Sequence, residues 1–396
     1  MPSEPMRTYE VDRLPIYLAY QEKSSFKETY GGAMDQVVVE GQHLKPKDSP
    51  HKTVLIFMHP TGVMNLLPMP NALARAGIPV MTCGSRYPHN DSGLIMEKVI
   101  LDLGAYIRYA KEKLGYETVV LAGWSGGGSL SMFYQSQAEQ PDIDATPAGD
   151  PVDVVGAKLI PADAVLQLAA HVSRAITLTE WLDPSIQDEL DPYTKDPELD
   201  LYDPQNPNQA PYTSDYLDRF RAAQIARSEK ITAWVQNRLD DLKAKGLPHE
   251  EQAFVVHGTM ADPRWLDLAI DPNDRKGPNW CYMGEPRTVN MMPAGLARYS
   301  SLRSWLSQWS FHESRADGPK CAGKISVPVL VIENSADDGC TPSHAARIMA
   351  GIGHDDKEFH RIQGATHYYL GQPEKMAEAV ALTIEWLTKK SFLKAS

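Results

Sequence analysis

Short apolar runs alternate with amphipathic stretches over the first 170 residues of the chain. The run from Thr53 to Met58 has the length of a strand and no polar face, as expected for a strand that is covered on both sides. Three further runs of this kind lie at 78–83, 118–122 and 163–170. Between them, apolar residues recur every three and four positions over 99–114, and Gly115 closes that helix. This alternation predicts an α/β fold with a doubly wound, mostly parallel sheet.

The N-terminal region carries weaker signals. Residues 8–50 are expected to form strands, with the β-branched run Val37–Val39 ending in a turn at Gly41. A helix is expected over about 65–76, closed by Gly77. We therefore expect the sheet to begin before the first fully apolar run.

The strand–helix rhythm stops between residues 171 and 324. Asp-Pro pairs crowd 183–213, a long helix is predicted over 214–245 with Ser214 as its N-cap, and another helix is predicted over 294–310. An insertion of about 150 residues is too long for a loop. We therefore expect it to form a helical subdomain, called the cap below, over the ends of the strands.

The rhythm resumes after the cap. The pattern ends with a strand at 327–332, a helix near 343–351, a strand at 357–362 and a helix over 373–389. The sequence thus predicts a core of residues 1–170 and 325–396, with the cap of 171–324 inserted between two late strands of the sheet.

Composition and charge narrow the range of partners. The chain has 396 residues, 42% of them hydrophobic, and a formal net charge of −12. Lys and Arg are scattered without a basic block, which argues against a nucleic-acid partner. No apolar run approaches about 18 residues and the N-terminus shows no apolar signal segment, so we expect neither a membrane span nor secretion. The four cysteines lack paired spacing, which favours reduced thiols in a cytoplasmic protein. The sequence leaves undecided whether the chain forms a homodimer.

The motif Gly-Trp-Ser-Gly-Gly over 123–127 is the clearest chemical signal. The apolar run at 118–122 leads into it and a helix-compatible run follows it, which is the strand–turn–helix context of a nucleophile elbow. Such a turn is so tight that glycine is needed beside the serine. A plain Gly/Ser loop is the alternative reading. We expect Ser125 to be a catalytic nucleophile.

A serine nucleophile needs a base and an acid, and the sequence offers both after strands. A serine hydroxyl is activated by a base in hydrogen-bond reach, which an acid orients. His367 follows the last predicted strand, and Asp337 and Asp338 follow the strand at 327–332. Counting from the end of that strand favours Asp337, whereas counting back from the next helix favours Asp338. Asp183 is a third candidate for the acid.

The order Ser, Asp, His and its three loops resemble the α/β-hydrolase superfamily. The loop Gly-Ala-Thr-His over 364–367 is similar to that family's histidine loop, and His-Pro-Thr-Gly over 59–62 resembles its oxyanion loop, with Pro60 in place of a glycine. The resemblance covers about 35–170 and 325–390. It does not cover the cap.

This resemblance implies roles for five residues. Ser125 would attack a carbonyl carbon, His367 would take the serine proton and return it to the leaving group, and Asp337 would orient His367. The backbone N–H groups of Gly126 and Thr61 would form the oxyanion hole. Proline has no N–H, so the second donor comes from Thr61 or from Gly62.

Several aromatic residues are candidates for substrate contacts. Trp124 and Tyr368 adjoin catalytic residues, and each could line the acyl pocket or serve packing. His59 is expected to support the oxyanion loop by hydrogen bonding rather than to act as a base. One predicted helical face either packs the core of the cap or faces substrate: it carries Tyr299, Leu302, Trp305, Leu306 and Trp309.

No metal or cofactor is expected. The remaining histidines, His171 and His344 among them, show no metal-ligand spacing, and the Asp-Pro-rich stretch lacks the ligand pattern of a calcium loop.

The sequence therefore predicts a serine hydrolase that cleaves a carboxylic ester or lactone of a mainly apolar small molecule through an acyl-enzyme. Hydrolysis of a carbon–carbon bond by the same triad is the alternative reaction. A non-catalytic ligand-binding receptor on the same fold is the alternative from another class.

Overall fold

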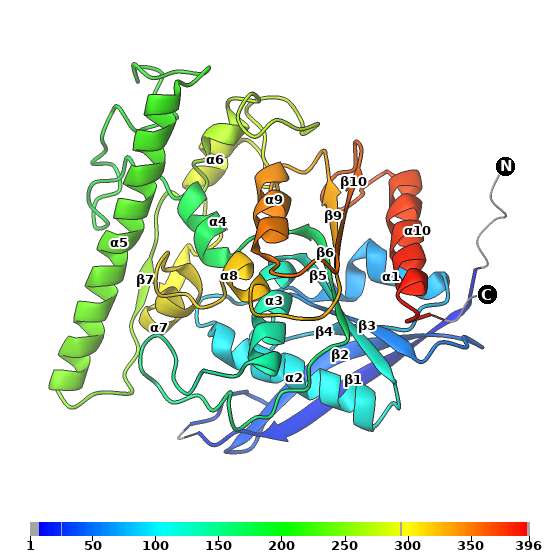
Figure 1. Ribbon diagram of the computed structural model, residues 1–396. Helices are drawn as coiled ribbons and strands as arrows, with labels where there is room; N and C mark the ends of the chain where they lie inside the picture. The colour runs from blue at the N-terminus through cyan, green and yellow to red at the C-terminus, as the bar shows by residue number, and fades with distance from the viewer. Residues whose placement is uncertain (1–7, 25, 294, 394–396) are drawn as a thin grey trace.

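A computed structural model describes residues 8–24, 26–293 and 295–393. Its centre is an eight-stranded sheet in the order β1-β2-β4-β3-β5-β6-β9-β10 (Figure 1). The strands are β1 (Val11–Gln21), β2 (Gln36–Pro46), β3 (Thr53–Met58), β4 (Val80–Cys83), β5 (Thr118–Ser125), β6 (Ala164–Ala170), β9 (Val329–Asn334) and β10 (Lys357–Ile362). Strand β2 pairs antiparallel with both of its neighbours, and every other pairing in this sheet is parallel. The predicted mostly parallel sheet is confirmed.

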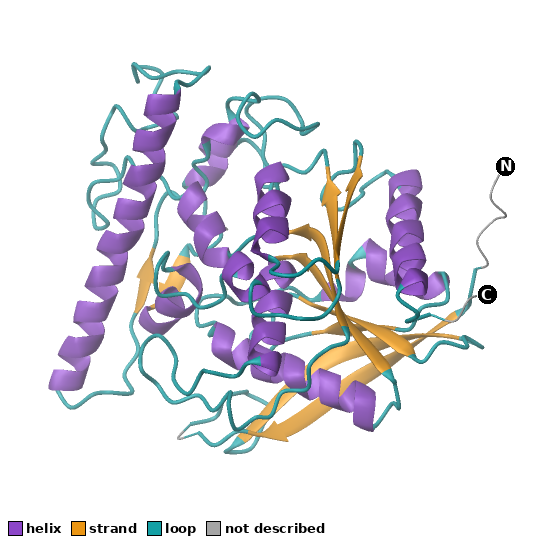
Figure 2. Ribbon diagram, viewed as in Figure 1, coloured by secondary structure: helices purple, strands orange, loops and turns teal. Residues whose placement is uncertain are grey.

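Helices cover both faces of the sheet, which explains why the central strands are apolar throughout. Side chains of α1 (Pro68–Arg75) and α10 (Pro373–Lys389) pack into the hydrophobic cluster on one face. The helices α2 (Met96–Glu112), α3 (Gly126–Glu139), α8 (Gly318–Ala322) and α9 (Pro342–Gly351) contribute to the cluster on the other face. Figure 2 shows the helices arranged around the sheet. All six side chains of β3 and all six of β9 are buried, as expected for strands covered on both sides.

The cap enters the sheet between two neighbours, because β6 precedes it and β9, which pairs with β6, follows it. Its longest helix, α5 (Ser214–Ala244), forms the outer edge of the molecule in Figure 1, with α4 (Arg174–Trp181) between α5 and the core. The smaller elements are β7 (Ala253–Val255), a 3-10 turn (Pro263–Trp265), α6 (Pro286–Asn290), β8 (Tyr299–Ser301), α7 (Leu302–Ser304) and a π-helix (Trp305–Trp309). The division of the chain into two separate units stays a prediction.

Three expectations about local structure were wrong. The N-cap of α5 is Thr213 rather than Ser214, because Thr213 Oγ1 accepts the Tyr216 N–H at 3.3 Å. The predicted helix over 294–310 is instead strand β8, one turn of α7 and the π-helix, because 299–301 pair with β7. The chain does not turn at Gly41: β2 continues to Pro46, and Gly41 lies opposite Cys83, where a Cβ atom would come within 2.7 Å of the Thr82 carbonyl oxygen. Glycine is required there by close approach of the backbone rather than by a turn.

None of the helices in the described residues has the length and apolarity to cross a membrane.

Candidate active site

Ser125 lies at the point where β5 ends and α3 begins. Its φ and ψ angles are 53° and −125°, a combination that few non-glycine residues adopt. The turn is tight because α3 leaves directly against the strand: a Cβ atom on Gly123 would lie 2.6 Å from the carbonyl oxygen of Gly127. A Cβ atom on Gly127 would overlap the Met58 carbonyl. The glycines at 123 and 127 thus let the serine side chain stand at the apex of the turn.

Asp337 and His367 meet at the same edge of the sheet. They follow β9 and β10, which are parallel neighbours, so their loops leave the sheet side by side. His367 Nδ1 lies 2.5 Å from Asp337 Oδ2. Asp337 Oδ1 accepts the backbone N–H groups of Gly339 and Cys340, each at 2.8 Å, and the carboxylate is fully buried. With Nδ1 donating to the carboxylate, the other ring nitrogen, Nε2, is left to act as a proton acceptor.

Among the described residues, neither of the other two candidate acids is hydrogen-bonded to His367, which is paired with Asp337. Burial and the neighbouring Asp337 carboxylate raise the pKa of the half-buried Asp338 to about 6. Asp183 lies inside the cap, where its carboxylate accepts the Ser185 hydroxyl at 2.6 Å and the Asn290 amide at 2.8 Å. Neither contact of Asp183 involves His367, so the geometry favours Asp337 as the partner of the histidine.

The cap holds the loop that carries Asp337. Asn273 Nδ2 donates to the Asp337 carbonyl at 2.7 Å, and Trp265 Nε1 donates to the Asp338 carbonyl at 2.9 Å. The buried guanidinium of Arg264 donates to Thr341 Oγ1 at 3.0 Å. Asn273 and Trp265 therefore bind the backbone of this acid loop, which is residues 335–341, and Arg264 binds the side chain at its last residue.

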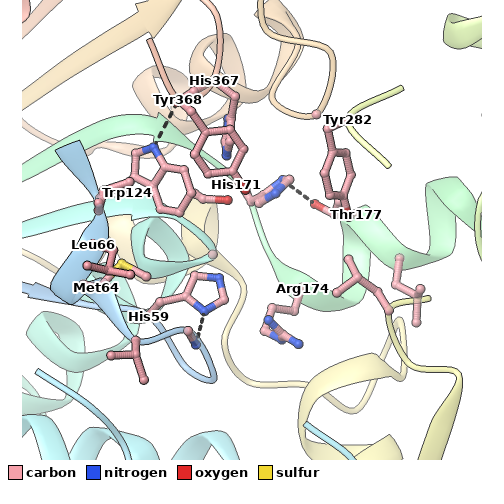
Figure 3. A pocket seen from close by; sticks show the side chains of 18 of the residues that line it. His59, Met64, Leu66, Trp124, His171, Arg174, Thr177, Tyr282, His367 and Tyr368 are labelled. Atoms are coloured by element: carbon pink, nitrogen blue, oxygen red, sulfur yellow. Dashed lines mark hydrogen bonds between the residues drawn. The ribbon is translucent and has the colours of Figure 1, made fainter. Parts of the chain in front are cut away.

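A cavity of about 440 Å³ lies between the carboxyl edge of the sheet and the cap. Ser125, Gly126 and His367 line it together. Figure 3 shows His367 at this cavity beside Tyr368 and Trp124. Predicted contact residues that also line it are His59, Trp124, Tyr368 and Trp309. The Trp124 indole N–H donates to the His367 carbonyl at 3.2 Å, so it braces the histidine loop as well as facing the cavity.

The prediction that Trp305 contacts substrate does not match the structure. Its side chain is buried in the hydrophobic cluster of the cap, and its indole N–H donates to Thr232 Oγ1 at 3.0 Å. Trp309, at the other end of the same π-helix, lines the cavity.

Comparisons with known proteins add the fold. No protein-family model and no curated protein sequence matches the chain. Among solved structures, it is similar to DcsB in complex with its substrate analogue, with a TM-score of 0.50 and 11% identity over 94% of this chain and 99% of that one. The chain has the α/β-hydrolase fold. Two further similar structures have lower TM-scores of 0.46: Est1E from Butyrivibrio proteoclasticus, at 14% identity over 89% of this chain and 96% of that one, and the siderophore hydrolase EstB from Aspergillus fumigatus, at 13% identity over 93% and 98%.

The loop over 59–62, proposed from the sequence as the oxyanion loop, is organised around a histidine. His59 Nδ1 accepts the backbone N–H of Gly62 at 2.9 Å and that of Thr61 at 3.2 Å. Both N–H groups proposed from the sequence as the second oxyanion donor are thus directed at the imidazole. Burial lowers the pKa of His59 to about 3, and the nearby positive charge of Arg174 acts in the same direction, so the ring is neutral at physiological pH.

Apart from Trp309, the sequence reading missed the part of the cavity wall that the cap supplies. His171, Arg174, Thr177 and Tyr282 all line the cavity on the side opposite Trp124 (Figure 3). Three of them lie just beyond β6, at the carboxyl edge where ligands of such sheets bind, and that position was the available signal. Tyr282 comes from an irregular cap segment, and no sequence pattern placed it there.

Arg174 is the charged member of this wall. Its guanidinium is buried, with Nε donating to Gln308 Oε1 at 2.9 Å and Nη2 donating to Asp91 Oδ2 at 3.1 Å. The guanidinium carbon also lies 4.5 Å from the centre of the Trp309 ring. Two hydrogen bonds and a stacked ring hold a cation at the edge of a mainly apolar cavity.

The fold also brings together groups that sequence spacing did not connect. Nitrogen atoms of His171 and His344 and the sulfur of Cys340 lie within 4.8 Å of one another, because β6 and the acid loop are adjacent at this edge. The sequence spacing of these residues gives no sign of this cluster, because they meet only through the fold. The absence of a metal site stays a prediction.

Proposed function

We propose that the protein is a serine hydrolase that cleaves a carboxylic ester or lactone through an acyl-enzyme. The observation that carries this proposal is the meeting of Ser125, on its strained turn, with His367 at one cavity, where His367 is hydrogen-bonded to the buried Asp337. A base oriented by an acid, beside a serine presented at an apex, is the arrangement that nucleophilic catalysis by serine requires.

The reaction begins with attack of Ser125 Oγ on the carbonyl carbon. The serine proton passes to His367 Nε2, and the imidazolium is stabilised by the Asp337 carboxylate at Nδ1. The carbonyl electron pair moves to the oxygen, which the N–H of Gly126 stabilises at the start of α3. Collapse of the tetrahedral intermediate expels the alcohol, which takes the proton from His367. Water then repeats the sequence on the acyl-enzyme and releases the acid.

The lining of the cavity supports a mainly apolar substrate with one polar group. Apolar side chains form most of the wall: Met64, Leu66, Leu67, Leu178, Leu296 and Trp309. Arg174 is the only lysine or arginine among the described residues that line the cavity. We propose that an oxygen-bearing group of the substrate, remote from the scissile carbonyl, binds at Arg174, because a buried guanidinium pairs favourably with carboxylate or carbonyl oxygens.

Hydrolysis of p-nitrophenyl esters with acyl chains from acetyl to octanoyl tests this function. We expect turnover that is abolished in Ser125→Ala, together with covalent labelling of wild-type Ser125 by a fluorophosphonate. The variant Ser129→Ala removes a buried hydroxyl one helical turn further along α3 and serves as the matched control. Wild-type protein that neither hydrolyses these esters nor reacts with the fluorophosphonate would refute the proposal.

We further propose that the protein acts in the cytoplasm. All four cysteines, at 83, 281, 321 and 340, are free and buried, which suits a reducing compartment.

A further inference from the structure

The hydrogen bonds of His59 define where its proton lies. A ring nitrogen that accepts hydrogen bonds cannot carry hydrogen, and Nδ1 accepts two backbone N–H groups, those of Thr61 and Gly62. The neutral imidazole must therefore carry its single proton on Nε2. Two donors on one acceptor also fix the plane of the ring.

The protonated nitrogen faces the nucleophile elbow. A Cβ atom on Gly126 would lie only 2.6 Å from His59 Nε2, with the other contacts of that Cβ atom made by the same ring. Gly126 is the residue whose N–H is the first oxyanion donor of the elbow. Both His59 and Gly126 line the cavity that contains Ser125, and Figure 3 shows the imidazole extending toward this cavity from the oxyanion loop.

The backbone donors of the oxyanion loop are already engaged. In the sequence reading, the second donor was an N–H of Thr61 or Gly62, but each of these donates to His59 Nδ1. If either turned toward an oxyanion, it would lose its bond to the ring. The His59 ring therefore holds both backbone donors of this loop.

We propose that the Nε2–H group of His59 is the second donor of the oxyanion hole, acting with the Gly126 N–H. This inference rests on the proposed serine hydrolase function. As the Ser125 Oγ–carbon bond forms, the carbonyl π electrons move to the oxygen, and this oxygen accepts hydrogen bonds from both groups. His59 keeps its proton throughout, and the proton of Ser125 goes to His367.

The neutral state of His59 suits this role. A cationic His59 would need a proton on Nδ1, which would face the two backbone N–H groups, so the loop geometry excludes it. Burial and the positive charge of Arg174 disfavour the cation further. A donor held in a fixed orientation needs no reorganisation when charge develops on the substrate oxygen, which is the basis of oxyanion stabilisation.

Two isosteric substitutions separate this role from support of the loop. In His59→Asn, the amide oxygen can replace Nδ1 as the acceptor for Gly62, while the Nε2–H donor is lost. In His59→Gln, the amide nitrogen can replace Nε2–H, while the Nδ1 acceptor is lost. If Nε2–H stabilises the oxyanion, His59→Asn should lower kcat for p-nitrophenyl butyrate by about 10²–10³ with little change in KM. His59→Gln should retain activity within about tenfold of wild type.

The opposite ranking would overturn the proposal. If His59→Asn remains within about threefold of wild type, or if both variants lose activity equally, His59 only positions the loop. A second readout is affinity for a boronic acid that mimics the tetrahedral intermediate. It should weaken in His59→Asn in proportion to kcat/KM, whereas affinity for the product carboxylate should change little.

A measurement on unmodified protein keeps the proposal testable if the variants fail to fold. Nitrogen-15 NMR of histidine-labelled wild type should show His59 as the neutral tautomer with hydrogen on Nε2, and a neutral Nδ1–H tautomer would refute the inference. The proposed function fails separately, when wild-type protein shows no ester hydrolysis. Active wild type with an equally active His59→Asn variant rejects this inference alone.

Discussion

Replacing Asp337 with asparagine should disable the base while preserving the shape of the site. Oδ1 of Asp337 accepts two backbone N–H groups at 2.8 Å, from Gly339 and Cys340. In Asp337→Asn, the amide oxygen must take that position, because an NH2 group there would face two other donors. The NH2 group then points at His367 Nδ1, 2.5 Å away in the wild-type pair, and forces the histidine proton onto Nε2. Such a histidine cannot accept the proton of Ser125.

The expected loss follows from the wrong tautomer. A tautomer change of this kind in a serine triad lowers kcat by roughly 10⁴, which corresponds to about 5.4 kcal/mol of transition-state stabilisation. The assay is steady-state hydrolysis of p-nitrophenyl butyrate near neutral pH, with kcat and KM determined separately. KM should change little, because the asparagine leaves the cavity lining intact.

Asp338→Asn is the matched control. Asp338 is adjacent in sequence and half-buried, and its pKa is raised to about 6. This variant should keep kcat within about threefold of wild type. An Asp337→Asn variant within tenfold of wild type, or an Asp338→Asn variant that loses as much activity as Asp337→Asn, would refute the assignment of the acid.

Three further predictions concern packing, specificity and pH. Gly128→Ala should lower the free energy of unfolding, measured in urea, by about 1–3 kcal/mol, because a Cβ atom there would overlap Ala170 and lie 2.8 Å from Gln167 Oε1. The control Gly93→Ala, with open space around its Cβ position, should change this free energy by less than about 0.5 kcal/mol. Arg174→Met should reduce kcat/KM roughly 10–100-fold for an aryl ester whose acyl chain ends in a carboxylate, and less for the neutral ester of equal length. An equal loss of kcat/KM for the two esters would show that Arg174 does not bind the substrate carboxylate. Burial alone would raise the pKa of Glu180, but the positive charges of Arg264 and Arg221 outweigh burial and lower this pKa from an ordinary 4.5 to about 2. The ionised Glu180 therefore adds stability above about pH 4.5, and this stability is lost as the pH falls toward 2. The melting temperature should therefore fall less between about pH 5 and pH 3 in Glu180→Gln than in wild type, and parallel curves would contradict this account.

The pattern of apolar residues along the chain predicted the strands and helices whose positions are set by which of their faces are buried. The fully apolar β3 and the final helix α10 have the bounds that their sequences indicate, since a strand covered on both faces and a helix with one apolar stripe leave direct traces in the chain. Ser125 and His367, the proposed nucleophile and base, were selected for a related reason: catalytic groups in a doubly wound sheet follow its strands. The structure brings both residues to one cavity.

Features that depend on distant partners could not be read from the chain. The aromatic run around Trp305 has helical spacing, but pairing of 299–301 with β7 prevents a single helix. Because proline at position 60 has no N–H, the sequence left Thr61 and Gly62 as the two choices for the second oxyanion donor. Nothing in the sequence shows that the N–H groups of both residues donate to the His59 ring. Arg174 was missed because its burial depends on Trp309 and Asp91, which come from opposite parts of the chain.

The hydrogen bonds from Trp265 and Asn273 to the acid loop bear on how this protein can evolve and be engineered. These bonds join positions 73 and 64 residues apart in the chain. The outer surface around α5 can accept substitutions without consequence for the chemistry, whereas the stretch from Arg264 to Arg275 must change in step with residues 335–341. A chimera that exchanges the whole insertion for that of a relative would thus remove the hydrogen bonds that hold the loop of Asp337, the proposed triad acid. A recombined protein should keep its activity only when the stretch from Arg264 to Arg275 and residues 335–341 come from the same parent.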